Sequence, residues 1–356
     1  MDFYKIFLSV IVVFTTMTGC SRVEQNSDSE TLNNVSHEIT AGLEVHFIDV
    51  GQADAALIRC GEESMLIDGG NAEDSNIIYT YLKKYEISEL DYIVASHAHE
   101  DHIGGLAGAL NYASAKNALC PVKYYDSRAF KNFVKYLASS GDGTEITIPS
   151  PGDSFTLGDA QVDILGCNGA ENTNDSSVIL KITYDETSFL FTGDAERAAE
   201  QAVLDFCAES EYDLSSTVLK VGHHGSDSST TYPFLREIMP EYAVISVGKD
   251  NSYGHPSDDT LSRLYDAGAQ VYRTDLCGDI IFRSDGKEIA VETAENQSAD
   301  KQLYILNTST KKYHREWCKN VDDIKDKNKQ IFRGSAKELE ESGYSPCGSC
   351  GKSDVQ

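Results

Sequence analysis

The ten-residue run SHAHEDHIGG, at positions 96–105, gathers three of the nine histidines of the chain within six positions. His97 and His99 alternate, so in extended backbone both imidazoles face the same way. Asp101 and His102 follow where the chain turns towards a helix. Imidazoles and carboxylates hold Zn²⁺ or Mn²⁺ firmly and leave a coordination position open for water. Two interleaved pairs of such ligands predict two metal ions rather than one.

The elements that must position this run are short apolar strands alternating with amphipathic helices. Expected strands cover residues 43–50, 55–60, 64–68, 91–96, 162–166, 176–184, 188–194, 216–222, 242–248 and 270–275. Expected helices cover residues 74–85, 104–113, 196–208, 230–239 and 258–268. Strand-rich halves with helices between them predict an α/β (α+β) domain whose sheets are covered by helices. This domain spans residues 42–293, a linker follows at 294–302, and a small module occupies 303–351.

The N-terminal segment has the layout of a bacterial lipoprotein signal peptide over residues 1–20. An apolar run follows Lys5 and ends in MTGC, which resembles the site where Cys20 becomes the acylated N-terminus. The apolar run is shorter than a membrane span requires, so we favour a lipid anchor over a transmembrane one. The polar residues 21–41 then form a flexible tether. These features predict an exported lipoprotein on the extracytoplasmic face of the cell membrane, where disulfides are permitted.

The whole chain of 356 residues carries a formal net charge of −27, and 40% of its residues are hydrophobic. That apolar fraction is ample for a packed core. The negative charge argues against a general coat for nucleic acids, whose phosphates are held by clustered Lys and Arg. It fits the solubility surface of an exported protein.

The motifs together resemble the metallo-β-lactamase-fold hydrolases, and among them the hydrolase domain of ComEC-type DNA-uptake proteins. The similarity covers about residues 43–292. Its segments occur in the order FIDVGQADA, MLIDGG, SHAHEDHIGG, NDSSVIL, FLFTGDAE, LKVGHHGS, NSYGHPS and YRTDLCGDI. The ordered series is more specific than any single motif. The resemblance implies a four-layer αββα sandwich with a metal site at one edge of its two sheets.

The resemblance also implies a role for each motif residue. His97 and His99 would bind the first metal ion, and Asp101 and His102 the second, while Asp194 bridges them with its two oxygens. One histidine of GHHG would complete the second site. We favour His223, which follows the strand directly, with His224 as the alternative and otherwise a contact to substrate.

Further polar residues are expected around the metal ligands. Asp68 would support the metal loop through hydrogen bonds, and His255 would contact or protonate the substrate. Lys220 is a candidate for either a supporting or a substrate role. Many members of the fold carry another histidine between the metal loop and the bridging Asp, but none lies between His102 and Asp194 here. Asn174 and Asp175 are the candidate substitutes.

The implied chemistry is hydrolysis by a water that two divalent cations, Zn²⁺ or Mn²⁺, convert to hydroxide near neutral pH. Asp101, His224 and His255 are the candidate catalytic residues. A phosphodiester, most of all DNA, is the expected substrate. Two alternatives stay open: a phosphoesterase for a small or cell-wall substrate such as phosphocholine, and a DNA-capture lipoprotein without catalysis. The sequence shows no obligate protein partner.

The C-terminal module carries an H-x3-C and C-x2-C arrangement formed by His314, Cys318, Cys347 and Cys350. Four such ligands suit a closed tetrahedral Zn²⁺ site that stabilises a small domain. A disulfide involving Cys347 is the alternative. The stretch resembles the metal-binding domain of the Ada DNA-repair protein, except that His314 replaces a cysteine. Its candidate DNA-phosphate contacts are Lys311, Lys312, Arg315 and Lys319.

Overall fold

The computed structural model of the chain describes residues 42–141, 143–167, 173–294, 302–315, 318–334 and 336–350. The expected signal peptide with Cys20, the tether and most of the linker therefore lie outside the described residues. Among the helices that are described, none combines the length and the apolar character needed to cross a bilayer.

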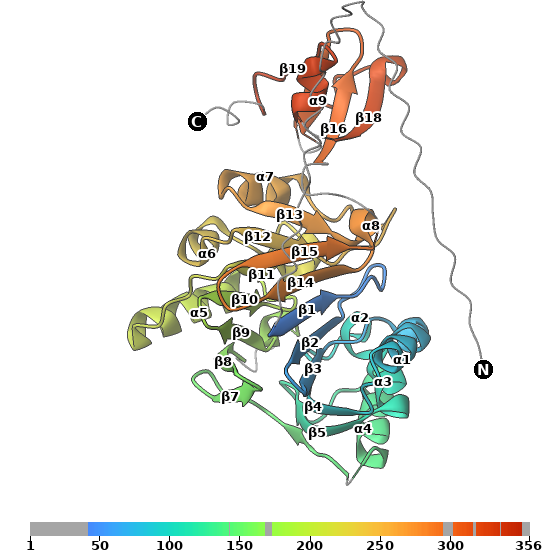
Figure 1. The fold of residues 1–356 in the computed structure, drawn as a ribbon, viewed down its shortest axis with the longest axis vertical. Helices are drawn as coiled ribbons and strands as arrows, with labels where there is room; N and C mark the ends of the chain where they lie inside the picture. The colour runs from blue at the N-terminus through green and yellow to red at the C-terminus, as the bar shows by residue number, and fades with distance from the viewer. Residues whose placement is uncertain are drawn as a thin grey trace, which may run out of the picture. The chain divides into compact units, whose positions relative to one another are not determined.

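Two mixed sheets form the body of the larger domain (Figure 1). The first sheet has the strand order β15 (Ile289–Thr293), β14 (Ile280–Ser284), β1 (Leu43–Phe47), β2 (Ala56–Cys60), β3 (Glu63–Ile67), β4 (Glu89–Val94), β5 (Ser114–Leu119) and β6 (Ile146–Thr147). The second sheet has the order β13 (Gln270–Arg273), β12 (Tyr242–Ile245), β11 (Val218–Lys220), β10 (Thr187–Phe191), β9 (Ile179–Tyr184), β8 (Ala160–Gly166) and β7 (Ser154–Leu157).

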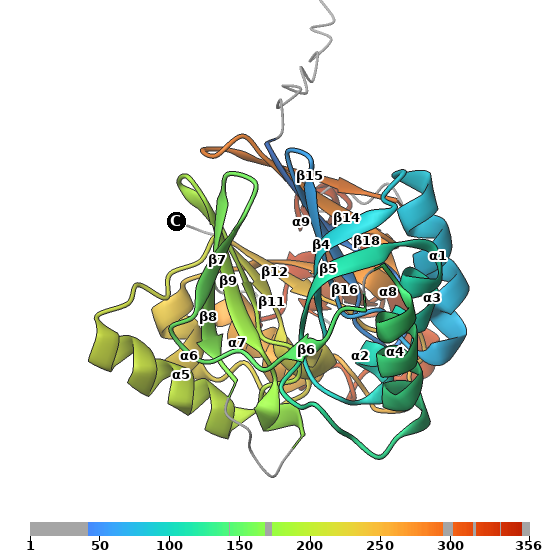
Figure 2. The ribbon, with the colours of Figure 1, turned by 90° about the horizontal axis from the view of Figure 1, so that it is seen from below.

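Helices cover the outer face of each sheet, as Figure 2 shows. The helices on the first sheet are α1 (Ser75–Lys84), α3 (Leu106–Tyr112) and α4 (Arg128–Ser139), and those on the second are α5 (Arg197–Ser210), α6 (Tyr232–Ile238) and α7 (Asp258–Asp266). Shorter turns are η1 (Ala72–Asp74), α2 (Glu100–Ile103), η2 (Asn174–Ser176), η3 (Gly222–Gly225) and α8 (Thr274–Cys277). The expected four-layer αββα sandwich is therefore confirmed.

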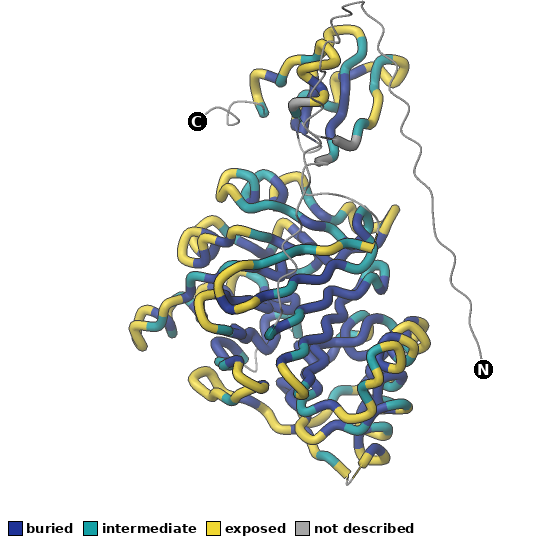
Figure 3. Tube along the Cα trace, viewed as in Figure 1, coloured by how far each residue is buried: buried dark blue, intermediate teal, exposed yellow. Residues whose placement is uncertain are grey.

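The core is divided into layers by the alternation of side chains along each strand. In β10, Phe189 and Phe191 belong to the cluster between the two sheets, whereas Leu190 between them packs into the cluster under α5 and α6. Both faces of the strand are buried, which explains the three consecutive apolar residues 189–191. Figure 3 shows the buried residues concentrated in the sheets and the exposed ones on the outer helices and loops.

The direction of the strands brings the polar motifs to one edge. β3, β4 and β5 run parallel, and so do β10, β11, β12 and β13. The metal loop follows β4, Asp68 follows β3, Asp194 follows β10 and the GHHG turn follows β11. In such sheets, sites form beyond the carboxyl ends of the strands.

Two glycines allow the metal loop to pack against the end of β3. A Cβ at Gly105 would lie 1.8 Å from the carbonyl oxygen of Gly69, and a Cβ at Gly104 would lie 2.3 Å from the backbone nitrogen of Ala72. The backbones therefore approach more closely than any side chain permits. The GG pair that ends SHAHEDHIGG sets the position of the histidines before it.

The C-terminal module is a third sheet with its own small core. Its strand order is β18 (Lys329–Gly334), β16 (Gln302–Asn307), β17 (Lys312–Arg315) and β19 (Ser345–Pro346), accompanied by η4 (Asp326–Asn328) and α9 (Ala336–Glu341). The buried cluster consists of Tyr304, Leu306, Tyr313 and Leu339. Four buried apolar side chains contribute little to the free energy of folding. A module of this size therefore needs a further stabilising link, such as a bound metal ion or a disulfide.

Candidate dinuclear metal centre

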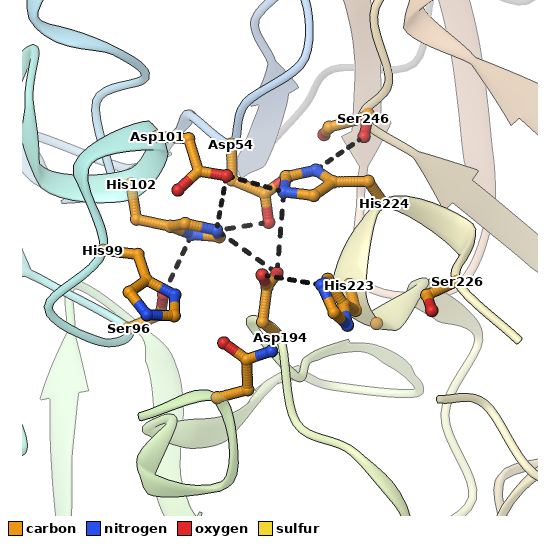
Figure 4. A network of polar contacts seen from close by, with 12 residues as sticks. Asp54, Ser96, His99, Asp101, His102, Asp194, His223, His224, Ser226 and Ser246 are labelled. Atoms are coloured by element: carbon orange, nitrogen blue, oxygen red, sulfur yellow. Dashed lines mark hydrogen bonds and ion pairs between the residues drawn. The ribbon is translucent and has the colours of Figure 1, made fainter. Parts of the chain in front are cut away.

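The carboxylate of Asp194 lies at the centre of the site, with its two oxygens facing different histidines (Figure 4). Oδ1 is 3.2 Å from Nε2 of His102 and 3.7 Å from Nε2 of His224. Oδ2 is 3.8 Å from Nε2 of His97 and 3.7 Å from Nε2 of His223. Asp194 is 2% exposed. A buried carboxylate in this arrangement can give one oxygen to each of two cations.

The second metal position is the better assembled one. One ligand atom from each of Asp101, His102, Asp194 and His224 lies within 4.8 Å of the others. Oδ2 of Asp101 is 3.4 Å from Nε2 of His224 and 3.9 Å from Nε2 of His102. Two imidazoles and two carboxylates in this group suit Zn²⁺ or Mn²⁺.

The structure places His224, not the expected His223, in the second position. The reason is the backbone of the GHHG turn, in which His223 (φ 49°) and His224 (φ 52°) are both left-handed. This turn directs the second imidazole inward, where it is buried, and leaves His223 with 24% of its side chain exposed. His223 instead approaches the oxygen of Asp194 that also faces His97.

The two histidines of the second position are each oriented through Nδ1. Nδ1 of His224 lies 3.0 Å from the backbone oxygen of Ser246, which can only accept a hydrogen bond. Nδ1 of His102 lies 2.9 Å from Oδ2 of Asp68. A proton on each Nδ1 leaves Nε2 free to bind a cation, a tautomer that outer partners commonly fix in metal sites.

Asp68 also supports the start of the metal loop. Its Oδ1 accepts a hydrogen bond from the backbone N–H of Ser96 at 2.7 Å, and its Oδ2 accepts one from the Ser96 hydroxyl at 2.6 Å.

In the first metal position, His97 Nε2 and His99 Nδ1 are 3.0 Å apart. This spacing suits two nitrogens that share one cation.

Lys220 is buried and forms an ion pair with Asp54 rather than facing substrate. Its Nζ is 2.7 Å from Oδ2 of Asp54, and the two residues are 4% and 4% exposed. Oδ1 of Asp54 is 3.3 Å from Nδ1 of His224. Sequence reasoning assigned Asp54 no role, although it lies in the motif FIDVGQADA. The pair joins the loop after β1 to the end of β11 behind the metal ligands.

Asn174 and Asp175 bond to residues around the start of α5, and Asp175 is in none of the ligand groups formed by the described residues. Oδ1 of Asp175 accepts hydrogen bonds from the backbone N–H of Glu196 and of Ala199, at the start of α5. Nδ2 of Asn174 donates to Oε1 of Glu196 at 3.1 Å. Glu196 in turn lies 3.3 Å from Nδ1 of His223. Asn174 thus bonds to a carboxylate that faces His223, whereas Asp175 holds the backbone at the start of α5.

His255 lies at the edge of the site. The centroid of its ring is 5.7 Å from that of His223, and its half-buried side chain faces no described hydrogen-bond partner at Nδ1. Burial, together with His223 and His224, lowers the pKa of His255 below its usual value. The neutral imidazole is therefore the main form near pH 7.

Several buried atoms at the centre fit bound cations. Nε2 of His102, Nε2 of His224 and Oδ1 of Asp194 have no hydrogen-bond partner among the described residues, and all three point to the same place. Leaving buried polar atoms unsatisfied is costly. A cation between them satisfies all three, so the residues present fit the metals that the motifs predict.

The protonation states of the histidines differ between the two positions. Burial and the neighbouring His102 lower the pKa of His97 well below its usual value. Burial also lowers the pKa of His102 and of His224, but the charge of Asp194 outweighs this effect in both residues. Asp194 and Asp68 raise the pKa of His102 well above normal, and Asp194 and Asp54 raise that of His224 to about 10.

The C-terminal ligands also lie together. One atom each of His314, Cys318, Cys347 and Cys350 lies within 4.8 Å of the others. The sulfurs of Cys318 and Cys347 are 3.9 Å apart, which is too far for a disulfide bond. No disulfide joins the described cysteines of the chain.

Of the candidate phosphate contacts in the module, Arg315 is the buried one. It is 4% exposed, and its guanidinium lies over the ring of Tyr304 at 5.0 Å and 3.3 Å from the Tyr304 hydroxyl. Lys311, Lys312 and Lys319 are exposed. The guanidinium of Arg315 is thus engaged by an aromatic ring, and a phosphate contact from this residue stays a prediction.

Metal binding should release protons from His102 and His224, because their raised pKa values keep both charged at pH 7 and a ligand must be neutral. We expect the affinity of the second position to rise with pH, by about tenfold per pH unit for each proton released, up to the pKa of the histidines. Calorimetry in buffers of different ionisation enthalpy measures the number of protons released on metal binding. A binding enthalpy that is independent of the buffer would contradict this proton release.

Lys220→Met should destabilise the fold by about 3–5 kcal/mol, since it leaves the buried Asp54 without its cation. The double variant Lys220→Met/Asp54→Asn should recover much of this loss because neither charge then remains. Urea unfolding of the metal-free parent, both single variants and the double variant measures the coupling. Purely additive losses would mean that the pair does not interact as the 2.7 Å distance implies.

Comparison with known proteins agrees with the geometry. The profile of the metallo-beta-lactamase superfamily matches residues 48–249, more than half of the chain. The chain is 30% identical over 260 residues to ComE operon protein 3 of Bacillus subtilis. It is 27% identical over 235 residues to Competence protein ComA of Neisseria gonorrhoeae, and 27% over 247 residues to Recombination protein 2 of Haemophilus influenzae.

These alignments cover 67%, 66% and 67% of this chain but 33%, 31% and 28% of the relatives. The chain thus spans about a third of the length of the curated relatives it matches. The profile match covers the strands that position the site, and the loops after them bring together the histidines and aspartates of a candidate dinuclear centre. The chain therefore belongs to the metallo-β-lactamase superfamily, as a metallohydrolase of that fold with competence proteins among its homologues.

Proposed function

We propose that this protein is an exported, metal-dependent phosphodiesterase that cleaves DNA. The observation that carries the proposal is the buried carboxylate of Asp194, each of whose oxygens faces a different pair of imidazoles. Sites for two adjacent cations of this kind serve phosphoryl transfer, in which charge develops on both the attacking and the leaving oxygen.

When bound, the cations supply Lewis-acid activation of water and neutralise charge on the phosphoryl oxygens. The chain supplies the rest. Asp68 and the carbonyl of Ser246 hold His102 and His224 in the tautomer that presents Nε2. Interactions with His224 and His102 outweigh the effect of burial and lower the pKa of Asp101, so its carboxylate is ionised at neutral pH.

His255 is the chain's candidate contact to the substrate. In its neutral form the imidazole carries one N–H, which can donate a hydrogen bond to a phosphate oxygen without first gaining a proton. Its lowered pKa makes this role more favourable than protonation of a leaving group. Its place beside His223, at the edge of the site, supports the assignment.

DNA is favoured over other phosphodiesters by the relatives. The name of Recombination protein 2 refers to recombination, a process that acts on DNA. Another match is named a competence protein. A small or cell-wall phosphoester remains the alternative outcome of the assay below.

Export and a lipid anchor complete the proposal. They depend on the pattern of residues 1–20 and on Cys20, the expected acylated residue. A lipid on Cys20 would hold the domain at the membrane surface through the polar residues 21–41.

We also propose one structural Zn²⁺ in the C-terminal module, held by His314, Cys318, Cys347 and Cys350. Hydrogen bonds to the sulfurs support it: the backbone N–H of Arg315 donates to Cys350 at 3.4 Å, and Nδ2 of Asn320 donates to Cys347 at 3.4 Å. The asparagine and backbone N–H groups near Cys347 outweigh burial and lower its thiol pKa to about 7. The thiolate is the form that binds zinc. Burial raises the pKa of Cys318 and of Cys350, so zinc binding would release their protons.

The purified protein should cleave DNA when supplied with Mn²⁺ or Zn²⁺. Asp194→Asn should lower kcat/KM by more than about 100-fold, since outer partners of metal ligands alone account for 10–100-fold. Lys131→Ala, an exposed substitution on α4, is the control and should match the parent. Single- and double-stranded DNA, a chromogenic phosphodiester and a phosphocholine ester are assayed together. Turnover of a small ester with DNA left intact would overturn the DNA assignment.

The module should retain one zinc per chain after dialysis, and Cys347→Ser should lose it while the metals of the larger domain remain. The physical reason is that removal of one thiolate opens a closed tetrahedral site. Elemental analysis per mole of chain measures the difference. A denatured, unreduced sample in which Cys347 fails to react with a thiol reagent would show a disulfide instead.

A further inference from the structure

The loop after β12 is held rigid by one side chain although it belongs to no helix or strand. Oδ1 of Asn251 accepts hydrogen bonds from the backbone N–H of Tyr253 at 3.1 Å and of His255 at 3.0 Å. Nδ2 of Asn251 donates to the backbone oxygens of Gly248 at 3.0 Å and His255 at 2.6 Å. These bonds fix the backbone on both sides of Tyr253.

Tyr253 presents its ring to solvent beside the metal centre. It is 72% exposed, and its ring lies over that of His255 with centroids 5.7 Å apart and planes 27° apart. The ring of His255 is 5.7 Å from that of His223, whose Nε2 is 3.7 Å from the bridging carboxylate. A row of rings thus leads from open solvent to Asp194.

An aromatic ring held in this way has a specific physical use. Rigid placement removes most of the entropy cost of ordering the ring when a ligand binds. Bases of unpaired nucleic acid stack on such rings, and this stacking is tolerant of sequence because every base has a π-face. It also gives affinity without positive charge, which suits a chain with a net charge of −27.

We propose that Tyr253 is a stacking platform for an unpaired base next to the scissile phosphate, so that the substrate class is single-stranded DNA or DNA with unpaired nucleotides at the cut. The inference rests on the proposed function. In the interior of a duplex, both faces of each base are covered by neighbouring bases. Such a base must first leave the stack to reach Tyr253, and that step costs free energy.

A double-deletion experiment tests the contact from both sides. Single-stranded oligonucleotides, identical except for one abasic position moved along the strand, are offered to the parent and to Tyr253→Ala. Binding is measured by anisotropy with Ca²⁺ in place of the catalytic metal, and cleavage is measured with Mn²⁺. We expect one abasic position to weaken parental binding by about 5–150-fold, the range that one stacked base supplies.

Tyr253→Ala should bind the intact strand as weakly as the parent binds the abasic strand. Removal of the base should not weaken binding to Tyr253→Ala any further. Tyr253→Phe, which keeps the ring, should retain the parental preference. Tyr232→Ala removes another exposed tyrosine, one whose hydroxyl bonds to Asp266, and should leave the preference unchanged.

Each outcome decides a different claim. If Tyr253→Ala weakens binding of intact and abasic strands equally, the ring only supports His255 and the inference is overturned. If no abasic position affects the parent, the inference is also overturned. If the strands bind with the expected dependence on Tyr253 but are never cut, the stacking platform stands and the proposed phosphodiesterase activity fails.

Discussion

The position of the Asp194 carboxylate between two groups of imidazoles is the constraint on which the rest of the site depends. Its oxygens are 3.2–3.8 Å from four ring nitrogens, which belong to histidines in the loops that follow β4 of one sheet and β11 of the other. A carboxylate that is 2% exposed keeps its charge only beside compensating cations. Bound metal ions would supply that compensation, and the charged His102 and His224 supply part of it without metal.

The buried charges around Asp194 form one connected system. Asp68 holds His102 and the start of the metal loop, while Asp54 lies between His224 and Lys220. Lys220 places its Nζ 2.7 Å from Oδ2 of Asp54, behind the ligands. Burial alone would raise the pKa of Asp54, but Lys220 and His224 together lower it below its usual range. Loss of one member should therefore disturb its neighbours as well.

Much of the fold and part of the site followed from sequence. The apolar runs located the strands on both sides of the metal loop, and ordered motifs gave the αββα class. Helix α4, despite its amphipathic sequence, and the hairpin of β14 and β15 were not predicted, because no motif directed attention to them. The structure groups His224 rather than His223 with the ligands of the second position, because two residues of the turn are left-handed, which spacing does not reveal. The Asp54–Lys220 pair spans 166 residues and emerges only when the sheets pack together.

Crystals grown with Mn²⁺, with anomalous scattering recorded at the manganese edge, test the central claim most directly. Two anomalous peaks should flank Asp194, one beside His102 and His224 and the other beside His97. A single peak, or peaks that do not contact Asp194, would contradict the account of a carboxylate that joins two cations.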